Sequence, residues 1–258
     1  MALISQETMM QALDWGYMKA VDGLAGLGTA SELAEDYRKA NPTARDAAYS
    51  LINWQMSKAA TSGFVTGLGG IITLPVAIPA NIGSVLYIQI RLVAAIAHLA
   101  GHDIRQDHVK TLIYACLAGS AAADVLKDAG IKFGMKMTVN LIRQVPGRVL
   151  IMINQRVGFR LATKAGTTGL INLGKIVPVV GGIIGGSFDA VSTRIIGNVA
   201  LNLFMPPETA DGAPDGDAAG GLVIADELAI EAAADAPPAG DADRPPAARG
   251  PAAPDNPV

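Results

Sequence analysis

All three histidines of the chain lie within 11 residues, together with two aspartates, and residues of these types can bind a metal ion. His98 and His102 are four residues apart, so on a helix both imidazoles would lie on one face and could share a metal. His108 and a carboxylate from Asp103 or Asp107 could complete the ligand set. Taken alone, this cluster predicts a metal-dependent enzyme.

The same segment also fits a polar turn between two helices, and this is the interpretation we favour. Gly101 is typical of a residue that ends a helix, so the helix would stop at the second histidine. Asp107 is suited to capping the helix that follows. The segment also lacks the glutamate that acts as general base in a His-Glu-x-x-His motif. We therefore expect no metal ion and no other cofactor.

Motifs of catalytic and nucleotide-binding proteins are missing from the sequence. The glycine-rich stretches at residues 67–70 and 181–186 are not followed by Lys-Ser or Lys-Thr, as a phosphate-binding loop requires. There is no Gly-x-Ser-x-Gly motif. The chain has a single cysteine, Cys116, so a disulfide scaffold is excluded. Cys116 lies in the apolar stretch TLIYACLAG and is expected to be a small core residue. These observations favour a non-catalytic protein.

Small residues repeat along the last apolar segment and predict a close contact between helices. They form two overlapping Gly-x-x-x-Gly pairs and continue at steps of four residues: Gly181, Gly182, Gly185, Gly186, Asp189, Thr193 and Gly197. Such a face lets a second helix approach closely, within the chain or in an oligomer. A carboxylate on it must be paired, and Arg91, Lys175 and Arg194 are candidate partners of Asp189. Asp189 is then a structural contact that fixes helix register, which we favour, or a proton- or ion-sensitive switch.

Charge is distributed unevenly over the 258 residues, whose formal net charge is -3. Residues 1–205 contain 18 basic and 12 acidic residues, a net charge of +6. No acidic residue lies between 129 and 188, where the basic residues are Lys132, Lys136, Arg143, Arg148, Arg156, Arg160, Lys164 and Lys175. A positive field of this kind attracts anionic partners, and we expect an anionic membrane surface. Nucleic acid is not expected, because few aromatic residues accompany these cations and no nucleic-acid-binding motif is present.

Residues 206–258 differ in composition from the rest of the chain. They contain 11 acidic residues, two arginines and 10 of the 15 prolines, and they have no aromatic residue. Such a segment cannot bury enough apolar surface to offset its ordering entropy, so we expect a disordered acidic tail after a helical domain at 1–205. Within the tail, residues 221–234 could form a short helix with Leu222, Leu228 and Ile230 as docking anchors, although a marginally helical alanine-rich stretch is the interpretation we favour.

The pattern of apolar residues and helix signals predicts an all-α domain, a multi-helix bundle. Thr29 and Glu32 have the spacing of a capping box, and Asn41-Pro42-Thr43 separates two helices. We find no run that alternates apolar and polar residues between turn signals, so no strand is predicted. The expected helices cover residues 29–40, 43–61, 79–100, 107–129, 131–145, 147–165 and 178–204.

Residues 59–90 form the longest stretch without a charged residue. Pro75 and Pro79 divide it into pieces shorter than the roughly 20 residues that a membrane-spanning helix needs. A glycine-rich apolar hairpin at residues 64–78, buried in the protein or re-entrant in a bilayer, fits better. Its candidate membrane-contacting residues are Phe64, Ile71 and Ile72.

Several of these segments together resemble a known family. Residues 63–101 include GLGGIITLPVAIPAN, a helix with Gln89 and Arg91, and LAGHD; the later stretch VPVVGGIIGGSFDAVSTRIIGNVALNLF is also similar. This pattern, over most of residues 40–205, resembles the EcsC family, in which a Gly-x-Asp corresponds to Gly101 and Asp103. His102 and the acidic tail are outside the family pattern. The resemblance implies no assigned activity, and the family is named after a gene beside an ABC-type transporter.

From these observations we expect a non-catalytic helical protein at the cytoplasmic face of the cell membrane. It would be an accessory to an ABC-type transporter or another envelope process, with a membrane protein as partner. The N-terminal sequence MALISQETMM lacks the positive region of a secretory signal, so we expect the protein to be cytoplasmic and peripheral to the membrane. The alternatives are a soluble interaction module regulated by its acidic tail and, less favoured, the metal-dependent enzyme.

Overall fold

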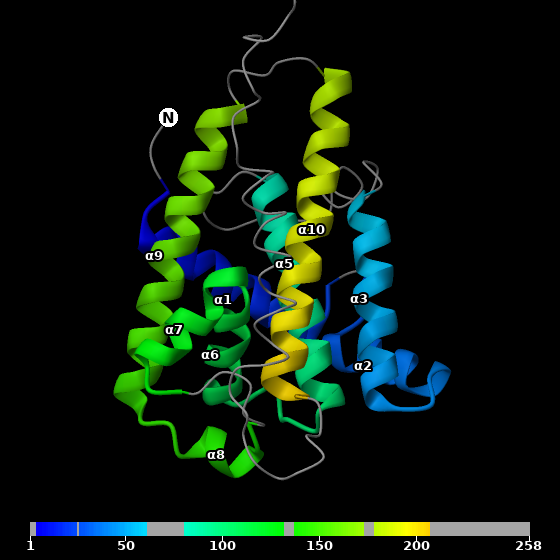
Figure 1. The fold of residues 1–258 in the computed structure, drawn as a ribbon, viewed down its shortest axis with the longest axis vertical. Coiled ribbons are helices and arrows are strands. Elements are labelled where there is room, and N and C mark those ends of the chain that lie inside the picture. The colour runs from blue at the N-terminus through cyan, green and yellow to red at the C-terminus, as the bar shows by residue number, and fades with distance from the viewer. Residues whose placement is uncertain (1–3, 25, 61–79, 132–136, 173–177, 207–258) are drawn as a thin grey trace, which may run out of the picture.

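The computed structural model describes residues 4–24, 26–60, 80–131, 137–172 and 178–206, including side chains except those of 58–60, 80–81, 166–172 and 178–189. The predicted hairpin with Phe64, Ile71 and Ile72, and the predicted tail after residue 206, lie outside the described residues. Within the described ranges every regular element is a helix, so the predicted all-α class is confirmed (Figure 1).

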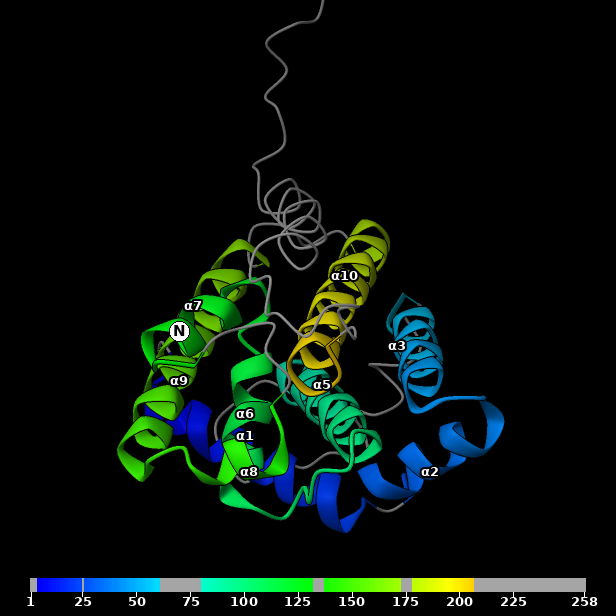
Figure 2. The ribbon, with the colours of Figure 1, turned by 60° about the horizontal axis from the view of Figure 1, so that its bottom comes forward.

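Helices of very different length make up the domain, with bounds α1 Gln6–Asp22, α2 Ala30–Ala40, α3 Ala44–Ala60, α5 Ala80–Leu99, α6 Asp107–Cys116, the short 3-10 helix η1 Gly119–Ala121, α7 Ala122–Asp128, α8 Val139–Arg143, α9 Gly147–Asn172 and α10 Pro178–Phe204. Helix α5 lies at the centre. On one side of it pack α2, α3 and α10, and on the other α1 and α6, with α7 and α9 outside them (Figures 1 and 2).

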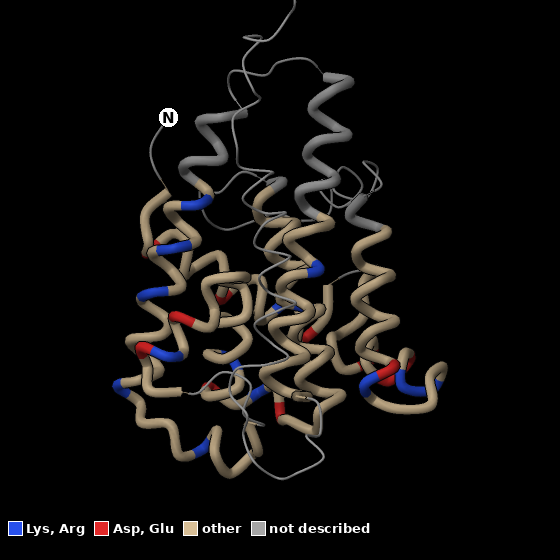
Figure 3. The backbone as a smooth tube through the Cα atoms, viewed as in Figure 1, with Lys and Arg blue, Asp and Glu red and all other residues tan. Residues whose placement is uncertain are grey.

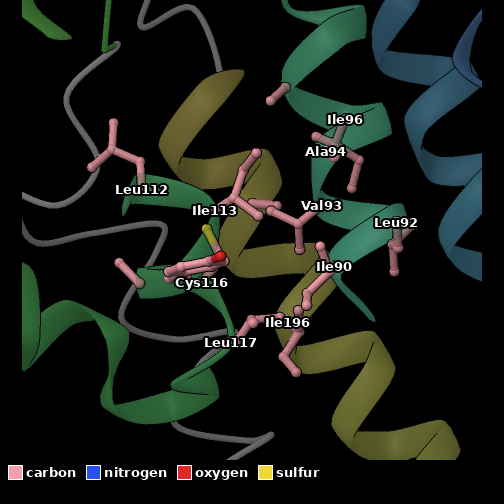
Figure 4. Packing of buried hydrophobic residues seen from close by; sticks show 14 of the residues in the cluster. Ile90, Leu92, Val93, Ala94, Ile96, Leu112, Ile113, Cys116, Leu117 and Ile196 are labelled. Carbon is pink, nitrogen blue, oxygen red and sulfur yellow. The ribbon is translucent and has the colours of Figure 1, made fainter. Parts of the chain in front are cut away.

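The core forms where α5, α6 and α10 meet. Side chains of Ile90 and Val93 from α5 lie beside Ile113 and Cys116 from α6, and Ile196 of α10 closes the group (Figure 4). All five are buried. Burial raises the pKa of the Cys116 thiol far above its ordinary value, because the thiolate would lose its hydration. Cys116 is therefore the small core residue that the sequence predicted.

Two helix boundaries predicted from local sequence signals are confirmed. Thr29 Oγ1 accepts from the backbone N–H of Glu32 at 3.0 Å, and Glu32 Oε2 accepts from the N–H of Thr29 at 2.8 Å, which completes the predicted capping box. Gly101 has a φ of +85°, and its N–H donates to the carbonyl of His98 while His102 N–H donates to that of Ala97. This pair of bonds is a Schellman ending and stops α5 where predicted.

Three other expectations were wrong. The single helix predicted for residues 107–129 is divided into α6, η1 and α7, because Gly119 has a φ of +60°, which a continuous α-helix cannot accommodate. Asp107 is the first residue of α6 rather than its cap, and Gln106 precedes it without a capping side-chain bond. The helix expected at 131–145 is reduced, among its described residues, to the five of α8, which Thr138 caps at the N–H of Leu141.

Helix α1 was missing from the predicted set. Ser5 caps it by accepting from the N–H of Thr8 at 3.0 Å, and Gly23, with a φ of +92°, ends it. At Gly16 the helix lies against α5 so closely that a Cβ would be 2.9 Å from Ile90 Cδ1. This contact lets α1 cover one side of the central helix.

Helix α5 is one of the two most apolar helices among the described residues. Residues Ile82–Leu99 have a mean hydropathy of 1.6. By length and composition alone, this segment could cross a membrane. However, 67% of this segment is buried inside the bundle. Its packing against the surrounding helices accounts for its composition, as in other core helices.

Candidate functional site

Helix α9 has one face in the core and one face open to solvent. Ile153, Val157 and Leu161 follow at steps of four residues and are buried against α1, α6 and α7. Gly158 lies against α1, where a Cβ would be 2.9 Å from Met10 Sδ. Gln6 Nε2 of α1 also donates to the backbone carbonyl of Gln155 at 3.0 Å. These contacts fix which face of α9 points outward.

The outward face of α9 exposes two large apolar side chains. Ile151 is 60% exposed and Phe159 63%, more than any other large hydrophobic residue among those described. Gln155 lies between them at the same four-residue spacing, so the three share one face. Arg148 is exposed one turn before Ile151 on this face, and Arg160 is exposed next to Phe159 in sequence, about a quarter turn around the helix. We call these five residues the α9 surface.

All charged residues of α9 itself are basic. Helix α9 has no acidic residue over its 26 positions, and Lys and Arg recur along it in Figure 3. Arg156 differs from its neighbours because it forms an ion pair with Asp128 of α7. In the described part of the chain, Arg148 and Arg160 have no such carboxylate partner. Cations flanking exposed Ile and Phe are typical of an amphipathic helix that lies at a membrane interface.

The other basic candidates have varied positions. Arg143 is exposed on α8, and Lys164 is partly exposed on α9. Lys132, Lys136 and Lys175 lie outside the described residues. The predicted basic stretch is thus partly gathered on α9. The sequence analysis did not find the exposed Ile151 and Phe159, because no local signal separates them from the buried apolar residues of the same helix.

The three histidines point to three different neighbours. His98 Nε2 lies 3.2 Å from Glu35 Oε1 of α2, and His108 Nε2 lies 3.1 Å from the carbonyl oxygen of Val145. His102 is 5% exposed, and its ring lies against Phe204 of α10 with centroids 5.3 Å apart. No group of three His, Cys, Asp or Glu side chains within the described ranges is close enough to hold one metal ion.

Asp103 also has local partners. Its carboxylate accepts from the backbone N–H of Arg105 at 3.0 Å and from Gln106 Nε2 at 3.3 Å, and so orders the turn between α5 and α6. The segment around the histidines therefore has the geometry of a polar turn between helices. It does not assemble a reaction centre.

The buried ring of His102 lacks one hydrogen bond. Its Nδ1 atom is buried without a partner among the described residues. Burial lowers the pKa of His102 from its ordinary value, because the imidazolium would be desolvated beside Phe204. Burial therefore favours the neutral form of His102.

The described part of the small-residue face of α10 packs inside the chain. Thr193 is buried, and a Cβ added at Gly197 would lie 2.7 Å from Ile52 Cγ1 of α3. Gln89 Nε2 of α5 donates to Ser192 Oγ at 3.3 Å on the neighbouring face. Gly181, Gly182, Gly185 and Gly186 belong to α10, but their surroundings and the side chain of Asp189 are outside the described residues.

A polar cluster between α1 and α6 was not found from the sequence. Asp14 Oδ1 accepts from Tyr114 at 2.9 Å and lies 2.7 Å from Lys110 Nζ. The ammonium of Lys110 also lies 5.3 Å from the ring centroid of Tyr17, whose hydroxyl donates to the carbonyl of Ile104. Burial, and then the Asp14 charge, raise the pKa of Tyr114. Asp14 and Tyr114 are 100 residues apart, so local pattern could not pair them.

Comparison with protein families assigns the chain. The model of the EcsC protein family matches residues 17–205, and the chain belongs to this family. The match begins inside α1 and ends one residue beyond α10, so it includes the α9 surface. No curated protein and no solved structure matches the chain.

Proposed function

We propose that this EcsC family protein is a non-catalytic peripheral membrane protein that binds anionic lipid through the α9 surface. The carrying observation is the exposure of Ile151 and Phe159 between Arg148 and Arg160, on a helix without acidic residues. The cytoplasmic leaflet is the expected target, because its anionic lipids give it a negative surface potential. An accessory role beside an ABC-type transporter or another envelope process is the form of this function that the family resemblance suggests.

Two kinds of attraction support this proposal. Each cation near an anionic surface contributes about 1 kcal/mol, and salt screens this contribution. Burying an exposed Ile or Phe side chain contributes roughly 1.5–3 kcal/mol, and salt does not screen it. Stable attachment of a peripheral protein generally needs both signals, and the α9 surface provides both on one helix.

Vesicle binding by the purified full chain tests this proposal. We expect it to bind phosphatidylcholine vesicles that contain phosphatidylglycerol and to bind pure phosphatidylcholine much more weakly. The Arg148→Gln and Arg160→Gln pair should weaken binding at low salt by roughly thirtyfold, the effect of about 2 kcal/mol. The Ile151→Ser and Phe159→Ser pair should instead remove most of the binding that persists at high salt.

Matched controls come from exposed or partly exposed residues on other helices. Met18 on α1 and Trp54 on α3 are 54% and 51% exposed, so Met18→Ser with Trp54→Ser removes comparable apolar surface. Lys19→Gln with Lys39→Gln removes the same charge from α1 and α2. Both control pairs should bind as the wild type does. Wild-type protein that ignores anionic vesicles at low salt, or control pairs as damaging as the α9 pairs, would refute the proposal.

A further inference from the structure

The α9 surface has chemistry complementary to one other segment of this chain. Residues 207–235 contain eight acidic residues and no lysine or arginine. Within them, residues 221–234 combine Leu222, Leu228 and Ile230 with three acids, Asp226, Glu227 and Glu231. An acidic segment with apolar side chains matches a helix face with exposed Ile and Phe between arginines.

We propose that residues 221–234 dock on the α9 surface and compete there with anionic lipid. The contact itself depends on complementarity between two parts of the chain. Its regulatory meaning rests on the proposed function. In the docked form the acids offset Arg148 and Arg160, and the apolar residues cover Ile151 and Phe159. Membrane binding then requires the segment to leave.

The chain leaves the bundle after α10 at the end where α9 begins, so residues 221–234 are connected near the start of α9. Helices α9 and α10 run in opposite directions, so the end of α10 and the start of α9 lie at the same end of the bundle (Figure 1). The length of chain between Pro206 and residue 221 allows a span of at most roughly 50 Å. Helix α9, with 26 residues, is about 39 Å long. The α9 surface is therefore within reach.

The expected strength suits a reversible contact. Exposed ion pairs contribute little individually, and salt weakens them further. The covalent connection compensates, because it holds the segment near α9 at an effective concentration on the order of millimolar. A membrane that offers many anionic headgroups can then displace the segment.

The first experiment measures the intramolecular contact without any membrane. Cysteines introduced at Thr163, one turn beyond Phe159, and at Ala234 would carry a fluorescent donor and acceptor in the full chain. The native Cys116 is buried and should remain unlabelled. We expect efficient energy transfer at low salt, which decreases as salt is added. Transfer that is low and independent of salt would overturn the docking proposal.

A charge-neutralised tail gives the matched comparison. Asp226→Asn, Glu227→Gln and Glu231→Gln remove three negative charges from the proposed docking segment. Asp241→Asn, Asp243→Asn and Asp255→Asn remove the same number further along. The first triple variant should abolish the energy transfer and tighten binding to phosphatidylglycerol-containing vesicles by roughly five- to tenfold at low salt. The second should change vesicle affinity less than about twofold. Equal effects of the two triples would refute a specific docking segment.

The two proposals fail in different ways. Energy transfer that the first triple abolishes, in a protein that binds no vesicles, would support the docking contact and refute the membrane function. Vesicle binding that depends on the α9 surface, with no energy transfer and no effect of the first triple, would support the membrane function and refute the docking.

Discussion

Gly197 of α10 lies directly against Ile52 of α3. A Cβ at residue 197 would be 2.7 Å from Ile52 Cγ1 and 2.9 Å from its Cδ1, closer than side-chain atoms normally approach. Helix α10 packs more extensively on α3 than on any other described helix, so this glycine permits a main contact of the bundle. The described part of the small-residue face therefore serves packing within one chain.

Gly197→Ala should destabilise the protein by about 1–3 kcal/mol, because the added methyl group overpacks a buried helix contact. The free energy of unfolding, measured by urea denaturation, tests this expectation. Gly147→Ala is the matched control, since a Cβ there would meet nothing within 4 Å, and it should cost nothing. Adding Ile52→Val to Gly197→Ala should recover part of the loss. A Gly197→Ala variant as stable as the wild type would contradict this contact.

The polar cluster between α1 and α6 leads to a second expectation. Tyr114→Phe removes the hydroxyl that donates to Asp14 and should lower the free energy of unfolding by about 1 kcal/mol. Tyr49→Phe removes a hydroxyl that is exposed and accepts from Arg45 Nη2 at 3.3 Å, so it should change stability by less than about 0.5 kcal/mol. Equal effects of these two substitutions would mean that the buried cluster does not hold α1 on α6.

The buried His102 makes stability depend on pH. Its pKa in the folded protein is lowered by burial, so below its ordinary pKa of about 6.5 the unfolded chain binds the extra proton more readily. The free energy of unfolding should therefore decrease as the pH falls through about 6.5 toward about 5.5. His102→Leu should make this decrease shallower. Urea denaturation at several pH values provides the measurement, and an unchanged slope in His102→Leu would assign the pH dependence to other groups.

Local chemistry explains what the sequence could predict about the helices. The capping box of Thr29 and Glu32 involves residues three apart, and the ending at Gly101 depends on one residue that tolerates a positive φ. The predicted bounds of the last helix match α10, which starts at Pro178, a residue favoured in a first helical turn. The break at Gly119 was missed because a glycine within an apolar helical pattern does not reveal its own φ.

The sequence also supplied the residue types of the candidate site, but tertiary structure decided their use. The histidines at 98, 102 and 108 are close in sequence, yet each turns to a different helix or loop, because successive side chains of a helix and turn point in different directions. Arg148 and Arg160 were recognisable as part of a basic stretch. The exposure of Ile151 and Phe159 has a different origin, because the packing of α1, α6 and α7 decides which face of α9 is buried. These contacts join residues that are distant in sequence, so no local pattern encodes them.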